Sequence, residues 1–130
     1  MLNLRYRRLW LGSVSALVLA VIVASLLPSS VVGLEAGLDK LVHFTGYLLL
    51  AVFGAGIVAS DKVPIVMMRV ILLGLGLEVA QALFTATRSA EWADAGADVA
   101  GVLVAWWLCR LGLEEWARLA EGWIERWRQR

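Results

Sequence analysis

The residues of this sequence that could do chemistry fall into three short groups beside or within apolar stretches. They are Asp39, Lys40, His43 and Tyr47; then Glu78 and Gln81; then Arg88, Glu91, Asp94 and Asp98. Carboxylates and an imidazole can transfer protons or hold a divalent cation, whereas Lys and Arg bind anionic groups. The residue types therefore allow acid–base chemistry, metal binding or recognition of a charged headgroup.

The spacing within each group is helical. His43 and Tyr47 are four residues apart, and so are Asp94 and Asp98. Residues three or four positions apart share one face of a helix. Each group therefore predicts one polar face on an otherwise apolar helix, and Arg88 and Glu91 are expected in the loop that precedes the last of these helices.

Composition indicates which elements must position these faces. Of the 130 residues, 61% are hydrophobic and 18% are charged, with one His and one Cys, whereas soluble domains carry about 25% charged residues. About 20 apolar residues span the ~30 Å hydrocarbon core of a bilayer. We therefore expect an all-α membrane protein of a single domain, 1–130, with four transmembrane helices, at about 9–28, 41–60, 63–85 and 93–111.

The first span is expected to be retained. Arg5, Arg7 and Arg8 precede it as in a signal peptide, but the apolar run is too long for an h-region, and positions 25–27 lack a small-x-small cleavage site. Cys109 is the chain's single cysteine, so no internal disulfide can form.

Basic residues predict the orientation. Placing both termini in the cytoplasm leaves only Lys40 and Arg88 outside and lets Arg69 snorkel inward. The basic residues then inside are Arg5, Arg7, Arg8, Lys62, Arg110, Arg118, Arg126, Arg128 and Arg130. This topology brings the three polar groups together at the outer leaflet, although it rests on basic residues alone and on none of the acidic residues or His43.

The C-terminal tail, 112–130, is expected to form an amphipathic helix at about 113–128 in the cytoplasmic membrane interface, with tryptophans at headgroup depth. One face carries Leu113, Trp116, Ala120, Trp123, Ile124 and Trp127, and the other Glu114, Glu115, Arg118, Glu121 and Glu125. A helix that binds a partner protein is the alternative.

The outer polar groups are expected to be net acidic by three when His43 is neutral. This balance comes from five acidic residues and two basic residues: Asp39, Glu78, Glu91, Asp94 and Asp98, and Lys40 and Arg88. A carboxylate at a helix centre in the bilayer costs of order 2.5–3.5 kcal/mol, so Glu78 needs a partner. The groups must take up protons, a cation or a cationic ligand group.

A structural interpretation stays open beside the functional one. Polar side chains can hold membrane helices together. Asp94 could cap the fourth helix, and Gln81 could only bridge helices. We favour a pocket because ionisable residues within a membrane are usually functional.

Four motifs together resemble VanZ-like membrane proteins. They are Asp39-Lys40-x-x-His43-Phe44-x-x-Tyr47, Glu78-x-x-Gln81, Arg88 followed six residues later by Asp94, and Asp98-x-x-Gly101. The resemblance implies a small integral protein of the bacterial cell envelope, located in the inner membrane, in a family named for a member associated with teicoplanin resistance. The position of Asp98 is commonly Asn in that family.

Three functions follow as hypotheses. The first is a pocket that binds a lipid or glycan-precursor headgroup and is linked to glycopeptide resistance or envelope homeostasis. Its ligand-binding residues would be Asp39, Lys40, His43, Tyr47, Glu78, Gln81, Arg88, Asp94 and Asp98. The second is an intramembrane enzyme acting on a lipid-linked substrate, with His43, Glu78 or Asp94 as catalytic candidates. The third is a small proton- or ion-coupled transporter. A divalent cation on Glu78, Asp94 and Asp98 and a homo-oligomer stay open; no feature indicates nucleic-acid binding.

Overall fold

The computed structural model describes residues 1–27, 36–84 and 91–130. The helices in these ranges are α1 (Arg7–Leu26), α3 (Ala36–Gly56), α4 (Val63–Phe84), α5 (Trp92–Leu108) and α6 (Trp116–Arg128), and no strand occurs within the same ranges. A short 3-10 turn, Ser60–Lys62, precedes α4. Four of the helical segments are long and apolar enough to cross a membrane. The expectation of an all-α membrane protein is confirmed.

The helix boundaries differ from the sequence expectation most clearly in α3. It begins at Ala36 rather than near 41, so Asp39 lies in its first turn. An apolar run marks only the part of a helix that matches the hydrocarbon, whereas backbone hydrogen bonding continues into the polar region, and an acidic residue suits a helix N-terminus. Asp39 and Lys40 are consequently helical and are held in fixed register with His43.

The end of α5 is also set locally. The helix widens into a π-helical turn, Cys109–Leu113, where Gly112 has φ 115°. Glycine adopts this left-handed conformation without steric cost and commonly ends helices. The chain then redirects into α6.

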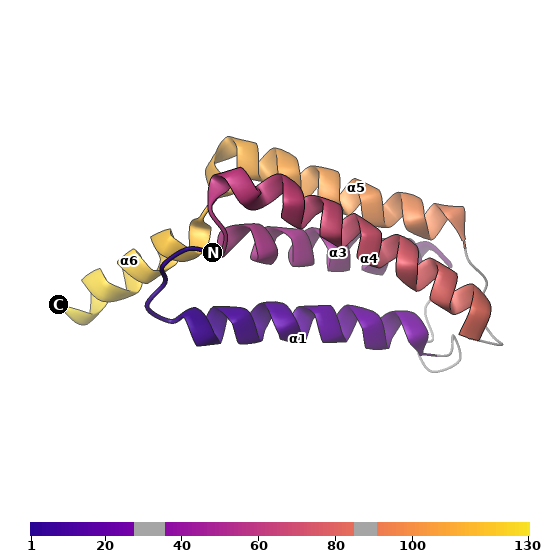
Figure 1. Cartoon of the computed structure of the whole chain (residues 1–130), viewed down its shortest axis with the longest axis horizontal. Coiled ribbons are helices and arrows are strands. Elements are labelled where there is room, and N and C mark those ends of the chain that lie inside the picture. The colour runs from indigo at the N-terminus through magenta and orange to yellow at the C-terminus, as the bar shows by residue number, and fades with distance from the viewer. Residues whose placement is uncertain (28–35, 85–90) are drawn as a thin grey trace.

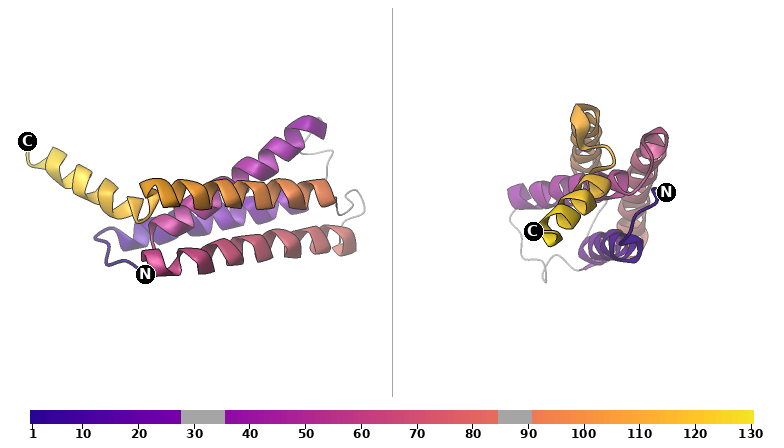
Figure 2. Two further views of the ribbon diagram at one scale, coloured as in Figure 1. Left: turned by 90° about the horizontal axis from the view of Figure 1, so that it is seen from above. Right: turned by 90° about the vertical axis from the view of Figure 1, so that its left-hand side faces the viewer.

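The four long helices run side by side, and α6 leaves the bundle at the end where both termini lie (Figure 1). Figure 2 shows α3 inclined to the others. The opposite end holds the start of α3, the end of α4 and the start of α5 (Figure 1).

Helices α3 and α5 approach each other closely because small residues face each other. A Cβ on Gly101 would collide with the backbone of Phe44 and approach that of Leu48, and Ala51 and Ala105 are fully buried. Small residues allow this contact between membrane helices, where no hydrophobic force drives association. The contact fixes the position of α3 along the axis of α5, because Gly101 must lie beside Phe44 and Leu48.

At the other end, α6 packs against the N-terminal segment, a contact that the expectation of an interfacial helix did not include. The indole of Trp116 forms edge-to-face contacts with Trp10 and Phe53 and donates a 2.9 Å hydrogen bond to the Val52 carbonyl. Glu121, expected on a polar outer face, is buried. Helical periodicity separated the two faces of α6 but could not identify their neighbours. We call Arg5, Tyr6, Trp10, Trp116 and Glu121 the terminal clasp.

Candidate functional site

The polar residues singled out in the sequence gather at the end of the bundle remote from the termini. Helix α3 carries Asp39, Lys40, His43 and Tyr47, α4 carries Glu78 and Gln81, and α5 carries Asp94 and Asp98, with Glu91 as its N-cap residue. Arg88 lies outside the described residues. We call Asp39, Lys40, His43, Glu78, Glu91, Asp94 and Asp98 the polar cluster.

The outer layer of the polar cluster is organised by Lys40. Its ammonium lies 2.6 Å from a Glu91 oxygen and 3.8 Å from an Asp39 oxygen, and it also pairs with Asp94. Three carboxylates therefore share one lysine. Asp94 does not act as the helix cap considered above, because its side chain pairs with Lys40 and the N-cap residue of α5 has no side-chain cap hydrogen bond.

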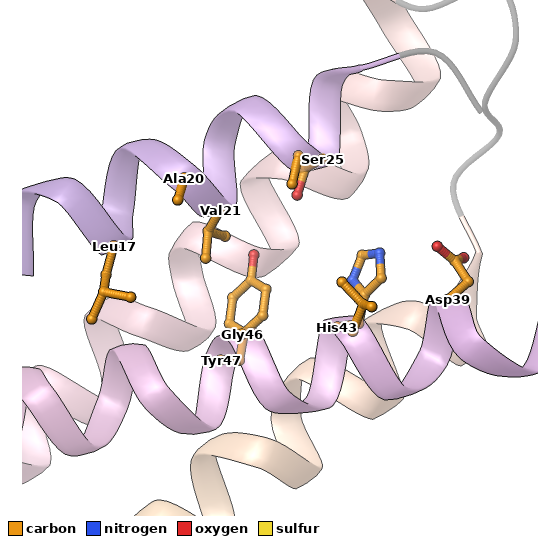
Figure 3. A pocket seen from close by; sticks show the side chains of 10 residues that line it. Leu17, Ala20, Val21, Ser25, Asp39, His43, Gly46 and Tyr47 are labelled. Atoms are coloured by element: carbon orange, nitrogen blue, oxygen red, sulfur yellow. The ribbon is translucent and has the colours of Figure 1, made fainter. Parts of the chain in front are cut away.

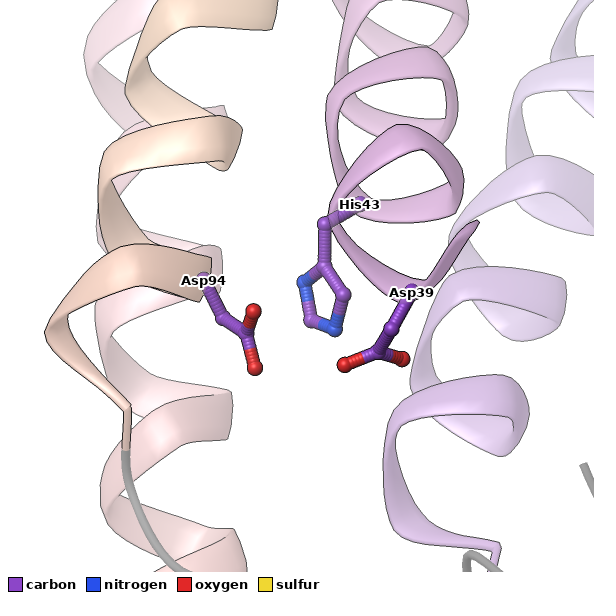
Figure 4. A group of neighbouring side chains, drawn as sticks. All are labelled: Asp39, His43 and Asp94. Carbon is purple, nitrogen blue, oxygen red and sulfur yellow. The ribbon is translucent and has the colours of Figure 1, made fainter. Parts of the chain in front are cut away.

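The inner layer joins three helices. Nδ1 of His43 lies 3.0 Å from Oδ1 of Asp98, and both side chains are buried. Glu78, also buried, accepts a 3.0 Å hydrogen bond from the Glu91 backbone amide. The His43 ring extends between the carboxylates of Asp39 and Asp94, so the two layers meet at this residue (Figure 4).

Two sets of side chains have the geometry to hold a metal ion. One consists of Asp39, His43 and Asp94, and the other of His43, Glu78 and Asp98. Within each set, one ligand atom per residue lies within 4.8 Å of the others. Both sets include His43. Each nitrogen of the ring can coordinate only one ion, so one nitrogen cannot complete both sets at once.

Asp98 has an unmet hydrogen-bonding requirement. Its Oδ2 is buried and has no hydrogen-bond partner among the residues that the structure describes. A Cβ on Gly74 would lie 2.9 Å from this oxygen and 3.0 Å from the Tyr47 ring, so Gly74 makes room for both. Sequence reasoning did not single out Gly74; a glycine one turn before Glu78 on an apolar helix was the available signal.

Two of the predicted site residues sit at the margin of the polar cluster. Gln81 is buried and donates a 2.8 Å hydrogen bond to the Ser25 carbonyl, which links α4 to α1. This contact agrees with the helix-bridging interpretation of Gln81. Tyr47 is only 2% exposed and lies one turn after His43 on α3, farther from the start of the helix.

A cavity of about 220 Å³ lies between α1 and α3. Its apolar wall includes Leu17, Val21 and Val42, and its polar end is formed by Asp39 and His43. In Figure 3 the side chains of Tyr47 and His43 point from α3 toward α1. The cavity therefore continues from the apolar part of the bundle to the polar cluster.

No protein-family model, curated protein or solved structure matches the chain. The resemblance to VanZ-like proteins stays a prediction, carried by the motifs alone.

Proposed function

We propose that the polar cluster and the adjoining cavity bind an envelope lipid or a lipid-linked glycan precursor, with the headgroup at the cluster and an acyl chain between α1 and α3. The observation that carries the proposal is the cavity of about 220 Å³, which is apolar along α1 and polar at Asp39 and His43. A cavity within the membrane-spanning part of a bundle borders lipid chains. An amphiphile matches both of its ends.

The chemistry of the polar cluster favours a headgroup that donates hydrogen bonds. Its described residues include five carboxylates and only one lysine. Carboxylate oxygens accept hydrogen bonds from sugar hydroxyls and from ammonium groups. A bare phosphate would be repelled here unless a cation accompanied it.

We place this site at the outer leaflet of a bacterial inner membrane. Both termini lie at the opposite end of the bundle (Figure 1), where Arg5, Lys62, Arg118 and Arg128 also lie. The enrichment of Lys and Arg in cytoplasmic loops supports a cytoplasmic location for that end. Cysteines introduced at Ser89 and Asp61 test this: an impermeant reagent should label the first from outside and not the second.

Lipid retention tests the proposal. Gly46 lines the cavity, and a Cβ there would already lie 3.7 Å from Val21, so Gly46→Leu should fill the space. Gly76→Leu is the matched control, because a Cβ at Gly76 meets nothing within 4 Å. Mass spectrometry of gently extracted protein should show about tenfold less bound lipid for Gly46→Leu only. Equal lipid in all three proteins would contradict the proposal.

The His43–Asp98 pair favours one second candidate, an enzyme acting on the headgroup. A carboxylate that contacts Nδ1, as Asp98 does in His43, orients an imidazole so that Nε2 can act as a general base. Incubation of the purified protein with envelope lipids separates the two functions, because only an enzyme gives a product of changed mass.

A further inference from the structure

We propose that His43, Glu78 and Asp98 form a binding site for one divalent transition-metal ion, at the base of the polar cluster. These residues come from α3, α4 and α5, and all three are buried. Their ligand atoms lie within 4.8 Å of one another. That spacing is close enough for a single ion to be reached by small side-chain rotations, since metal–ligand bonds are about 2.0–2.2 Å long.

The unpartnered oxygen of Asp98 is the independent observation that points to an ion. Asp98 is 2% exposed, and its Oδ2 has no hydrogen-bond donor within the described part of the chain. Buried carboxylates are normally paired, hydrogen-bonded or bound to a metal. Oδ1 already contacts His43, so Oδ2 is the atom that lacks a partner.

Charge distinguishes this set from the alternative one. Asp39 and Asp94 already share Lys40, whose ammonium neutralises part of that set. Glu78 and Asp98 have no lysine or arginine pairing in the described ranges. Two buried carboxylates with a neutral imidazole carry a charge of about −2, which one divalent cation balances.

The ligand atoms indicate the class of ion. One imidazole nitrogen with two carboxylates is a mixed set that suits Zn²⁺ or Mn²⁺ better than Ca²⁺ or Cu⁺. Three protein ligands leave coordination positions for other oxygens. The ion would thereby let the acidic cluster accept the phosphate of a lipid-linked headgroup; this role, unlike metal binding itself, rests on the proposed function.

Mn²⁺ alone, added to metal-stripped protein in lipid-free detergent, tests the inference. The chain contains one histidine, so a preparation without a polyhistidine tag allows an unambiguous assignment. Electron paramagnetic resonance should show one equivalent of bound Mn²⁺, with nitrogen modulation from His43 in the spin-echo signal. Absence of stoichiometric binding, or a bound ion without nitrogen coupling, would overturn the proposal.

Variants locate the ion. Asp98→Asn and Glu78→Gln should each weaken Mn²⁺ binding at least tenfold, whereas Asp61→Asn, an exposed acid at the other end of the bundle, should bind as wild type does. A loss for Asp94→Asn that equals or exceeds the loss for Asp98→Asn would place the ion in the outer layer and refute the assignment. Should Asp98→Asn fail to fold, the nitrogen signal of the wild type still decides. Since no lipid is present, this result is separate from lipid retention by Gly46→Leu.

Discussion

The two ends of the bundle use buried carboxylates in opposite ways. In the terminal clasp, Glu121 accepts hydrogen bonds from the Arg5 and Tyr6 amides and the Trp10 indole, at 2.8–2.9 Å. In the polar cluster, Asp98 leaves one oxygen without a donor among the residues described, and three carboxylates share Lys40. Both carboxylate oxygens of Glu121 therefore accept hydrogen bonds, whereas one carboxylate oxygen of Asp98 accepts none from the described residues.

The difference separates a structural polar group from a functional one. A buried carboxylate that accepts hydrogen bonds from its own chain stabilises the fold. The carboxylate and its donors give up hydrogen bonds to water on folding, but they replace them with hydrogen bonds to each other. One that lacks donors raises the free energy of the folded state until a ligand supplies them. The structural interpretation considered for the polar cluster, in which polar side chains only hold helices together, therefore fits the terminal clasp, whereas the polar cluster has the properties of a ligand site.

The largest effect is expected at the close contact between α3 and α5, which lies between the two ends of the bundle. Gly101→Val should lower the free energy of unfolding by about 3 kcal/mol, because its side chain must displace the backbone of α3. Unfolding in mixed detergent micelles measures this. Gly96→Val, on the same helix with open space around its Cα, is the control and should change little. Equal losses would refute the close contact.

A smaller effect is expected at the terminal clasp. Glu121→Ala removes the acceptor of three hydrogen bonds and should destabilise the protein by about 2 kcal/mol. Lipid retention and Mn²⁺ binding, corrected for folded fraction, should stay at wild-type levels. Loss of either binding activity at unchanged stability would erase the distinction between the two ends.

The smallest effect is a pH dependence that belongs to the terminal clasp. Burial alone would raise the pKa of Glu121, but the hydrogen bonds from Tyr6, Arg5 and Trp10 outweigh it and lower the pKa below its ordinary 4.5. A carboxyl group with a lowered pKa in the folded state stabilises the fold above the unfolded pKa, and this stabilisation is lost as the pH falls through the folded value. Wild type should therefore lose stability below about pH 4.5, and Glu121→Gln should lose less. Parallel pH profiles of the unfolding free energy would contradict this.

The sequence was sufficient for the spans and for the convergence of the polar groups, because apolar length and helical spacing act locally. Asp39, Lys40, Glu78 and Asp98 were placed at one end by counting residues along the helices. The partners of Trp116 and Glu121 could not be predicted, since periodicity defines the faces of a helix and not what packs against them. The role of Gln81 was ambiguous for the same reason, and the contact with Ser25 became visible only when α1 was placed against α4.

The unfolding free energy of Asp98→Asn, measured without metal or lipid, tests the central claim most directly. Asparagine can still accept a hydrogen bond from His43 but removes a buried charge that has an unpartnered oxygen. If the polar cluster is a ligand site, the variant should be as stable as wild type or more stable. A loss of about 2 kcal/mol, comparable with that expected for Glu121→Ala, would show that the polar cluster is a second structural clasp.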